Sequence, residues 1–209
     1  MLLAGDAAHV HSPFGGQGLS LGLVDAANLG WKLAAVIRGE MPDSLLDTYT
    51  AERRPVAEAV LANTLAQVAI LRPDPQSGAM RELVANLMQL DDVNRLLGEM
   101  TSGLSTRYEL GSALDEVGRL VGDRPVGKAS LYDLMQDGTG VLLDASTEKK
   151  ASSLVTATTQ RIRCVAVDTG PSMLIRPDAC VAWASEDGSM DGLEEALRRW
   201  FAPASIQAP

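Results

Sequence analysis

The sequence is poor in aromatic residues and in cysteine. Aromatic side chains make up 4% of the 209 residues, so leucine, valine, alanine and methionine must supply most of any core. The two cysteines, Cys164 and Cys180, are too far apart for a CxxC redox pair or a zinc knuckle. This cysteine usage is typical of a reducing compartment, and it predicts a cytoplasmic protein.

Basic charge and long apolar runs are also lacking. The formal net charge is −9, whereas a nucleic-acid partner would call for a basic face. No apolar run approaches the roughly 20 residues that span a bilayer. Residues 1–4 lead straight to Asp6, which argues against a signal peptide. We therefore expect neither a nucleic acid nor a membrane as a partner.

Metal-binding residues are equally sparse. His9 and His11 are the two histidines of the chain, and they alternate along a short segment. If that segment is extended, their side chains point to opposite sides. Asp6 is close in sequence, but no further carboxylate or histidine cluster completes a metal site. The sequence therefore predicts no metal.

Apolar periodicity predicts a helix from about Gln17 to Arg38. Residues spaced by three or four positions form one apolar stripe, namely Leu19, Leu23, Ala26, Gly30, Leu33 and Ile37. Asp25 and Lys32 fall on a different face of this helix. We expect Lys32 to lie on the helix surface and to tolerate replacement by alanine.

The rest of the first half also has helical patterns. Pro55 predicts the end or a kink of the next helix near Arg54, followed by a second helix to about Leu71. A proline-rich break covers residues 72–78, and helical periodicity resumes over residues 80–100. Residues 1–112 are therefore predicted to form a mostly helical domain after an opening loop.

The second half changes to short runs that are rich in Val, Ile and Leu. Four of them predict strands, at residues 141–146, 161–168, 172–176 and 180–185. The sequence RPDA between the last two is typical of a type I turn and predicts a hairpin. A final helix follows over residues 190–202. Residues 113–209 are therefore predicted to form a small α/β domain, and the whole chain is of the mixed α/β (α+β) class.

A glycine-rich loop stands before the first helix. In SPFGGQG, the residues Gly15, Gly16 and Gly18 permit close backbone approach, and the following helix directs roughly half a positive charge forward. A phosphate or an electron-rich ring edge would suit such a loop, and a connector without a ligand is the alternative. No Lys-Ser/Thr pair follows the last glycine, and the G-x-G-x-x-G spacing is absent, so neither nucleotide motif applies.

Asp6 ends a short apolar run in LLAGDAAH. A carboxylate in this place can accept hydrogen bonds from sugar-like hydroxyl groups. The alternative role is to cap its own loop.

Two stretches resemble a known family. The string GDAAHVHSPFGGQGLSLGLVDAANLGWKLA, followed by LLDTYTAERRPVA, resembles the second half of the class A flavin-dependent aromatic monooxygenases, the para-hydroxybenzoate hydroxylase-like enzymes. Within that class it is most similar to the bacterial hydroxylases of aromatic polyketides. LLDAS, PSMLIRPDACVAWAS and LEEALRRWF resemble their thioredoxin-like tail, here without a CxxC motif. The implied fold is the carboxy-terminal portion of an FAD-binding monooxygenase domain at 1–112, followed by a thioredoxin-like α/β domain at 113–209.

The resemblance implies a flavin site. Asp6 would bind the ribityl chain of FAD, and the loop from Pro13 to Ser20 would lie along the isoalloxazine ring with backbone amides at its N1–C2=O edge. The implied cofactor contacts of this loop are Pro13, Gly15, Gly16, Gln17, Gly18, Leu19 and Ser20. Ser20 stands where the family usually has Asn, and its side chain reaches less far. Val10, Pro13 and Phe14 would border the substrate cavity, with loop packing as their alternative role.

The implied reaction is hydroxylation of a phenolic, polyketide-type aromatic compound through a flavin C4a-hydroperoxide, with NAD(P)H as the reductant. No catalytic residue is assigned, because the cofactor carries the chemistry. The family's amino-terminal βαβ unit with G-x-G-x-x-G is absent from this sequence. We therefore expect the chain to be inactive without an amino-terminal half, and to pair with such a half or as a homo-oligomer. The alternative is a non-catalytic dimerisation or docking module.

Overall fold

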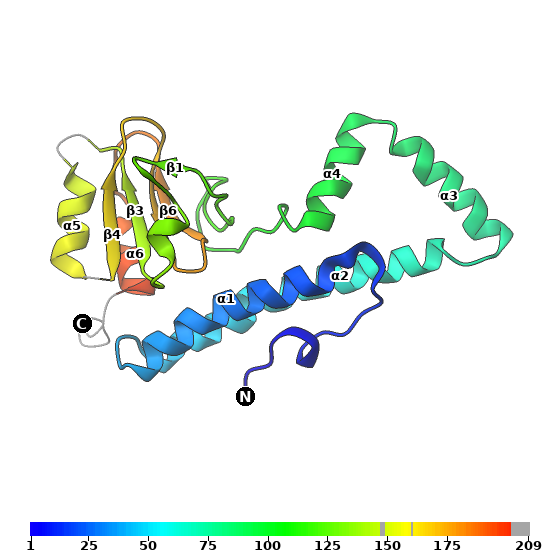
Figure 1. The fold of residues 1–209 in the computed structure, drawn as a ribbon, viewed down its shortest axis with the longest axis horizontal. Coiled ribbons are helices and arrows are strands. Elements are labelled where there is room, and N and C mark those ends of the chain that lie inside the picture. The colour runs from blue at the N-terminus through cyan, green and yellow to red at the C-terminus, as the bar shows by residue number, and fades with distance from the viewer. Residues whose placement is uncertain (147–148, 160, 202–209) are drawn as a thin grey trace. The chain divides into compact units, whose positions relative to one another are not determined.

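Figure 1 shows the chain as a computed structural model, which describes residues 1–146, 149–159 and 161–201. The chain forms two compact units. The first comprises residues 1–26 and 50–106, and the second comprises residues 27–49 and the described part of 107–209. Residues 27–49 thus belong to the same compact unit as the tail. The division into functional domains at 112 and 113 stays a prediction.

Helices make up the ordered elements of the first unit. In chain order, the helical elements up to residue 102 are η1 (Gly5–Ala7), η2 (Phe14–Gly16), α1 (Gln17–Ile37), η3 (Asp43–Leu46), α2 (Asp47–Ile70), α3 (Pro75–Leu87) and α4 (Asp91–Ser102). Within the first unit, α1 and α2 run antiparallel: residue 17 contacts residue 63, and residue 25 contacts residue 53. The predicted helix from Gln17 is confirmed.

The apolar stripe of α1 is largely exposed. Leu19, Leu23 and Ile37 have exposed fractions of 76%, 61% and 78%. The buried face instead carries polar residues, among them Asp25 at 1% and Lys32 at 0%. The expectation that Lys32 lies on the helix surface is therefore wrong. The physical reason is that the polar groups on this face form hydrogen bonds within the chain. Such groups can be buried, so the buried face does not have to be apolar.

Pro55 does not interrupt α2. The predicted end of the helix near Arg54 is wrong, since one helix runs from Asp47 to Ile70 with Pro55 inside it, whereas a kink at this point stays a prediction. Proline lacks the N–H that would bond to the carbonyl of Ala51 four residues earlier. Both residues are exposed, so water can serve that carbonyl. The helix therefore continues through the proline.

Helices α3 and α4 divide the predicted periodic segment in two. Asp74 caps α3, because its carboxylate accepts the Ser77 N–H at 2.9 Å. Neither helix contains a buried residue. Their apolar side chains are exposed, including Met80 (48%), Leu83 (53%), Leu87 (43%), Leu96 (54%) and Met100 (37%). These two helices present an apolar surface that the first unit itself does not cover.

The second unit contains a four-stranded sheet (Figure 1). Its strands are β3 (Gly140–Asp144), β4 (Ile162–Ala166), β5 (Ser172–Ile175) and β6 (Val181–Ser185), in the order β4-β3-β5-β6. β3 and β4 are parallel and joined through α5 (Lys150–Thr158), whereas β5 is antiparallel to both of its neighbours. Helix α6 (Leu193–Trp200) follows the sheet and contacts α5. This is the thioredoxin-like arrangement that the family resemblance implied, and the predicted fold class is confirmed.

Both faces of this sheet are buried. Along β3, Leu142 packs with α5, α6 and the aromatic rings of Trp31, Trp200 and Phe201. Its neighbours Val141 and Leu143 pack on the opposite face. That face is covered by the segment that contains β1 (Pro125–Val126), β2 (Ala129–Ser130) and η4 (Asp133–Met135). The alternation follows from the two-residue period of a strand.

The predicted RPDA hairpin joins β5 and β6, and its antiparallel pairing is confirmed. The Ala179 N–H donates to the Arg176 carbonyl at 2.9 Å, and Ala179 has a φ of +64°. Arg176 is fully buried and lies over the Trp200 ring, with its guanidinium carbon 4.3 Å from the ring centroid. Asp178 pairs with Arg176 and accepts a hydrogen bond from Asn28 Nδ2 at 2.9 Å. The turn therefore ties α1 to the sheet within the second unit.

One helical stretch among the described residues, Phe14–Ile37, is long and apolar enough to cross a membrane by length and composition. A single stretch of this kind is weak support for a span, because core helices of soluble proteins pass the same test. Asp25, Asn28 and Lys32 lie within it, are buried, and make hydrogen bonds inside the chain. The cytoplasmic location and the absence of a membrane partner stay predictions.

Candidate functional site

The candidate site begins with two short turns ahead of α1. In η1, the Ala8 and His9 N–H groups both donate to the Gly5 carbonyl, at 2.8 and 3.0 Å. In η2, Gly15 and Gly16 have φ values of +78° and +64°. Residues with a Cβ rarely adopt such angles, so the loop needs glycine at both positions. The chain thus reaches the start of α1 through a tight, glycine-dependent bend.

The loop is open at Gly16. A Cβ added at Gly16 would meet no atom within 4 Å, whereas one at Gly15 would lie 3.1 Å from the side-chain amide of Gln67. The first N–H groups of a helix have no acceptor inside that helix, and they lie at the positive end of its dipole. For α1 these are the amides that begin at Gln17. The loop therefore combines open space with hydrogen-bond donors that favour negative charge.

The structure places all the sequence-predicted site residues in the first unit. Most are exposed, namely Asp6, Val10, Pro13, Phe14, Gly15, Gly16, Leu19 and Ser20, while Gly18 is half-buried. Gln17 differs, because its side chain is 6% exposed and donates to the Met100 carbonyl at 2.7 Å. Only its backbone N–H is thus a candidate ligand. The assignment of these residues to a cofactor or a substrate stays a prediction.

The GD turn lies close against α1. A Cβ added at Gly22 would be 3.5 Å from the Gly5 Cα, so glycine at both positions permits this approach. Gly5 also has a φ of +56°. This contact fixes the peptide before Asp6 relative to the helix that carries the glycine-rich loop.

A buried polar cluster supports the same turn, and the sequence reasoning missed it. Asp25 Oδ2 accepts the Gly5 N–H at 3.0 Å and lies 2.6 Å from His9 Nε2, while Oδ1 accepts Arg53 Nε at 2.7 Å. The side chains of His9, Asp25 and Arg53 are 3%, 2% and 4% exposed. The sequence contained a signal for this cluster, because Asp25 lies within an apolar helix and Arg53 lies in the helix that follows.

Hydrogen bonding keeps Asp25 charged. Burial by itself would raise the pKa of this carboxyl group, but hydrogen bonds from Arg53, His9 and the Gly5 backbone lower it below its ordinary value. An ionised carboxylate only accepts hydrogen bonds, so the contact assigns a proton to His9 Nε2. Among the described residues, His9 Nδ1 then has no hydrogen-bond partner.

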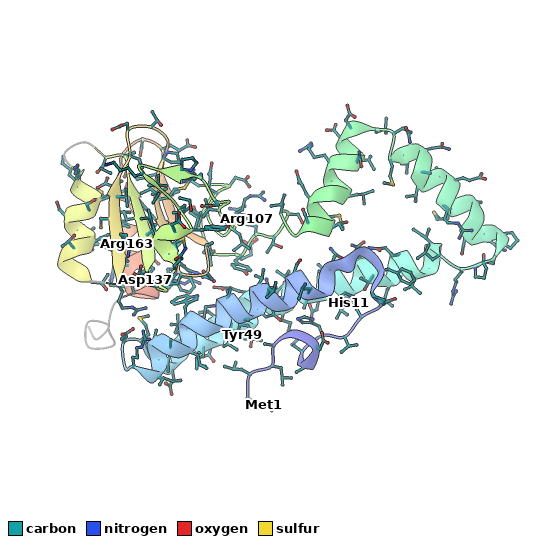
Figure 2. All side chains as sticks on the ribbon, viewed as in Figure 1. Met1, His11, Tyr49, Arg107, Asp137 and Arg163 are labelled. Carbon is teal, nitrogen blue, oxygen red and sulfur yellow. The ribbon has the colours of Figure 1, made fainter. Side chains whose placement is uncertain are left out.

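His11, which Figure 2 labels, lies in the loop before α1 and also has one ring nitrogen without a partner among the described residues. Its Nδ1 lies 2.8 Å from the Ser12 carbonyl oxygen, which assigns the proton to Nδ1. Its Nε2 has no partner among the described residues and faces Gly18, where an added Cβ would be 3.5 Å away. Two buried nitrogens of the loop thus retain unused hydrogen-bonding capacity. That arrangement suits a loop that receives a polar ligand.

The tail offers no comparable chemistry in its described part. Asp144, at the end of β3, accepts hydrogen bonds from the Ser152 N–H at 2.8 Å and the Ser152 hydroxyl at 2.6 Å. This carboxylate therefore holds the first turn of α5 at the end of β3. Cys164 lies half-buried in β4, and burial raises the pKa of its thiol. No group of three His, Cys, Asp or Glu residues that could hold a metal gathers among the described residues.

Two families match the sequence. Residues 1–64 match the family described as FAD binding domain, and residues 110–204 match the family described as aromatic-ring hydroxylase, C-terminal.

Relatives and a solved structure extend these matches over nearly the whole chain. A rifampicin monooxygenase of Streptomyces venezuelae is 42% identical over 205 residues, covering 98% of this chain and 43% of the relative. A 12-dehydrotetracycline 5-monooxygenase/anhydrotetracycline 6-monooxygenase of Streptomyces rimosus is 41% identical over 228 residues, covering 99% and 44%. The structure of the anhydrotetracycline hydroxylase OxyS from Streptomyces rimosus has a TM-score of 0.90 at 41% identity, covering 97% and 44%. The chain therefore spans less than half the length of these relatives.

A helical segment with an FAD binding domain match, followed by a thioredoxin-like domain, defines the class as FAD-dependent aromatic-ring hydroxylases. The chain matches the carboxy-terminal part of the class A flavin-dependent aromatic monooxygenases of the aromatic polyketide hydroxylase type. The resemblance inferred from the sequence is confirmed. The cofactor named by the matching family is FAD.

Proposed function

We propose that the chain is the flavin-edge part of an FAD- and NAD(P)H-dependent hydroxylase that acts on phenolic, polyketide-type aromatic compounds. The observation that carries the proposal is the open, glycine-dependent bend at Gly16, directly before the N-terminus of α1. When bound, FAD would supply electron transfer and oxygen activation. The residues of this chain would bind and orient the cofactor and the aromatic ring.

Each part of the loop has a distinct role in this proposal. Asp6 is exposed and is the middle residue of the η1 turn, so its carboxylate can accept hydrogen bonds from ribityl hydroxyl groups. The amides from Gln17 to Leu19, at the positive end of α1, would stabilise negative charge on the pyrimidine edge. Gly15 and Gly16 would let the backbone approach the ring. Pro13 and Ser20 are the first and last residues of this proposed cofactor loop.

Apolar residues beside the loop would border the substrate. Val10 and Phe14 have exposed fractions of 76% and 42%, and Pro13 is also exposed. Burying exposed apolar surface against an aromatic ring is favourable. These three residues would therefore line one side of a cavity for a planar aromatic compound.

An amino-terminal half would complete the site. The exposed apolar side chains of α3, α4 and the start of α1 form a surface that the first unit leaves uncovered, for example at Leu19, Leu83 and Leu96. The relatives are more than twice as long as the aligned part, since the chain covers 43–44% of them. We infer that a polypeptide equivalent to their preceding segment covers this surface, and that the chain alone is inactive. A second copy of the chain is the alternative occupant.

Flavin titration tests the proposal. The chain is combined with a separately expressed amino-terminal half from a relative, and flavin fluorescence quenching is followed. The assembled parent should quench flavin, and Asp6→Ala should weaken binding by ~10–150-fold, because a charge-assisted hydrogen bond contributes ~1.5–3 kcal/mol. Glu186→Ala, an exposed acidic residue that follows β6 in the second unit, serves as the control and should bind as the parent does.

Two glycines with similar backbone angles distinguish a specific effect of the loop on flavin binding from the effect of backbone strain alone. Gly16 and Gly39 have φ values of +64° and +68°, and an added Cβ would meet nothing within 4 Å at either position. Gly16→Val should abolish most flavin binding, whereas Gly39→Val should strain the backbone equally and leave binding intact. If the Asp6 and Gly16 variants bind flavin as tightly as the parent, the assignment is wrong. The docking-module alternative then applies.

A further inference from the structure

The GD turn is held from the inside by one carboxylate. Asp25 Oδ2 accepts a hydrogen bond from the Gly5 N–H at 3.0 Å, just before Asp6. The same oxygen lies 2.6 Å from His9 Nε2, three residues after Asp6. Between these two contacts, Asp6 itself is exposed. The carboxylate therefore fixes both ends of the turn that presents the Asp6 side chain.

Arg53 anchors this carboxylate to α2. Its Nε donates to Asp25 Oδ1 at 2.7 Å, and its Nη2 donates to the Leu21 carbonyl at 3.3 Å. The guanidinium thus hydrogen-bonds to α1 at Asp25 and at Leu21, which are one helical turn apart. Because the Asp25 and Arg53 side chains are almost fully buried, water competes little for either hydrogen bond. The carboxylate is held in one position by a group outside the loop.

We propose that Asp25 is a positioning residue that acts through Asp6: held by Arg53, it clamps the Gly5–His9 turn so that the Asp6 carboxylate is presented to the ribityl chain. This inference rests on the proposed flavin site and extends it to a carboxylate that does not face the cofactor. It assigns His9 the role of a fixed imidazole. Its Nε2–H donates to Asp25, and its Nδ1 has no partner among the described residues.

A merely structural role makes a different prediction. If the cluster only joins α1 to α2, its loss would lower stability and would weaken flavin binding independently of Asp6. If Asp25 acts through Asp6, removing Asp6 first should leave little for Asp25 to contribute. Neighbouring groups that act as a unit give such non-additive effects in a double-mutant cycle.

The first experiment uses the full chain without flavin. Amide hydrogen exchange is measured at Gly5 and, as an internal reference, at Leu142 in β3. Asp25→Asn should raise the exchange rate at Gly5 at least tenfold and leave Leu142 unchanged. Arg54→Met is the control, because Arg54 neighbours Arg53 but pairs with Glu58 on the exposed surface. Unchanged exchange at Gly5 in the Asp25→Asn variant would overturn the clamp.

The second experiment is the double-mutant cycle on the assembled protein, with flavin fluorescence quenching as the readout. Asp25→Asn should weaken binding about tenfold in the parent and less than twofold in the Asp6→Ala background. Equal losses in both backgrounds would overturn the proposal.

If Asp25→Asn does not fold, the pair Asp25→Leu with Arg53→Met replaces the buried ions by apolar groups of similar shape, which is often tolerated. That double variant should melt near the parent yet bind flavin at least tenfold more weakly, and parent-like binding would overturn the proposal.

The two proposals fail in different ways. If the assembled parent binds no flavin, the proposed function fails, and exchange at Gly5 alone decides whether the clamp exists. If the parent binds flavin and Asp25→Asn binds equally well, the flavin site stands and the positioning role of Asp25 is refuted.

Discussion

Lys32 is a buried cation on α1. It lies off the apolar stripe of α1, yet it is fully buried. Its Nζ donates to Asn28 Oδ1 at 2.7 Å and lies 5.9 Å from the ring centroids of Trp31 and Trp200. Trp200 is far away in sequence, and helical periodicity contains no information about such a partner. Periodicity alone could not reveal this burial.

The burial of Lys32 predicts a large effect of truncation. Lys32→Ala should lower the free energy of unfolding by about 2–4 kcal/mol, because it removes a buried hydrogen-bonded cation and leaves a cavity. Lys128→Ala, at an exposed position, should change it by less than about 0.5 kcal/mol. Urea unfolding of both variants is the measurement. Equal stability of Lys32→Ala and the parent would contradict the packing of α1 described here.

Asp144 makes the tail sensitive to acid. Burial by itself would raise the pKa of this carboxyl group, but hydrogen bonds from Ser146 and Ser152 lower it below its ordinary value. A lowered pKa stabilises the folded state fully above the ordinary pKa of about 3.9, and this stabilisation is lost as the pH falls through the folded-state pKa.

The corresponding prediction compares two acid profiles. Ser152→Ala removes one of these hydrogen bonds, so its Asp144 pKa should lie closer to the ordinary value. The loss of unfolding free energy between pH 7 and pH 3 should therefore be smaller in the variant than in the parent. Urea unfolding midpoints at several pH values provide the measurement. A variant whose acid loss equals that of the parent would show that Asp144 titrates normally.

At the scale of elements, the strands and their hairpin could be predicted from the sequence. Runs rich in Val, Ile and Leu are short and bounded by turn residues, and Pro177 marks the hairpin. The order β4-β3-β5-β6 was available only through the resemblance, since no local pattern encodes which strands pair. The orientation of α1 could not be predicted either. An apolar stripe predicts a helix but not which segment covers it.

Pro55 is the element-scale departure with a measurable consequence. A proline inside a helix costs up to about 3 kcal/mol relative to alanine, through the missing donor and the ring clash. Because α2 continues through Pro55, Pro55→Ala should raise the free energy of unfolding by about 1–3 kcal/mol. Pro75→Ala, at the start of α3 where no donor is needed, should have a smaller effect. Thermal unfolding of both variants checks this, and a destabilised Pro55→Ala would show that α2 requires the proline.

For the whole molecule, the candidate site was only partly predictable. The glycine-rich loop and Asp6 could be identified from residue chemistry and the resemblance, because each is carried by a short continuous stretch. The cluster of His9, Asp25 and Arg53 could not, because it joins positions 16 and 28 residues apart in a loop and two helices. Such a cluster depends on how α1 lies against α2. The predicted loop residues are mostly exposed, and their assignment to a cofactor or a substrate stays a prediction.

In the proposed site, the backbone amides at the start of α1 face the flavin. The most direct test follows the backbone amide resonances of Gln17, Gly18 and Leu19 while flavin is added to the chain assembled with an amino-terminal half. These three amides should shift and gain protection from exchange, while the Gly39 amide, which bonds to the Val36 carbonyl at 2.9 Å, should not change. Flavin that binds without altering the Gln17–Leu19 amides would contradict the account.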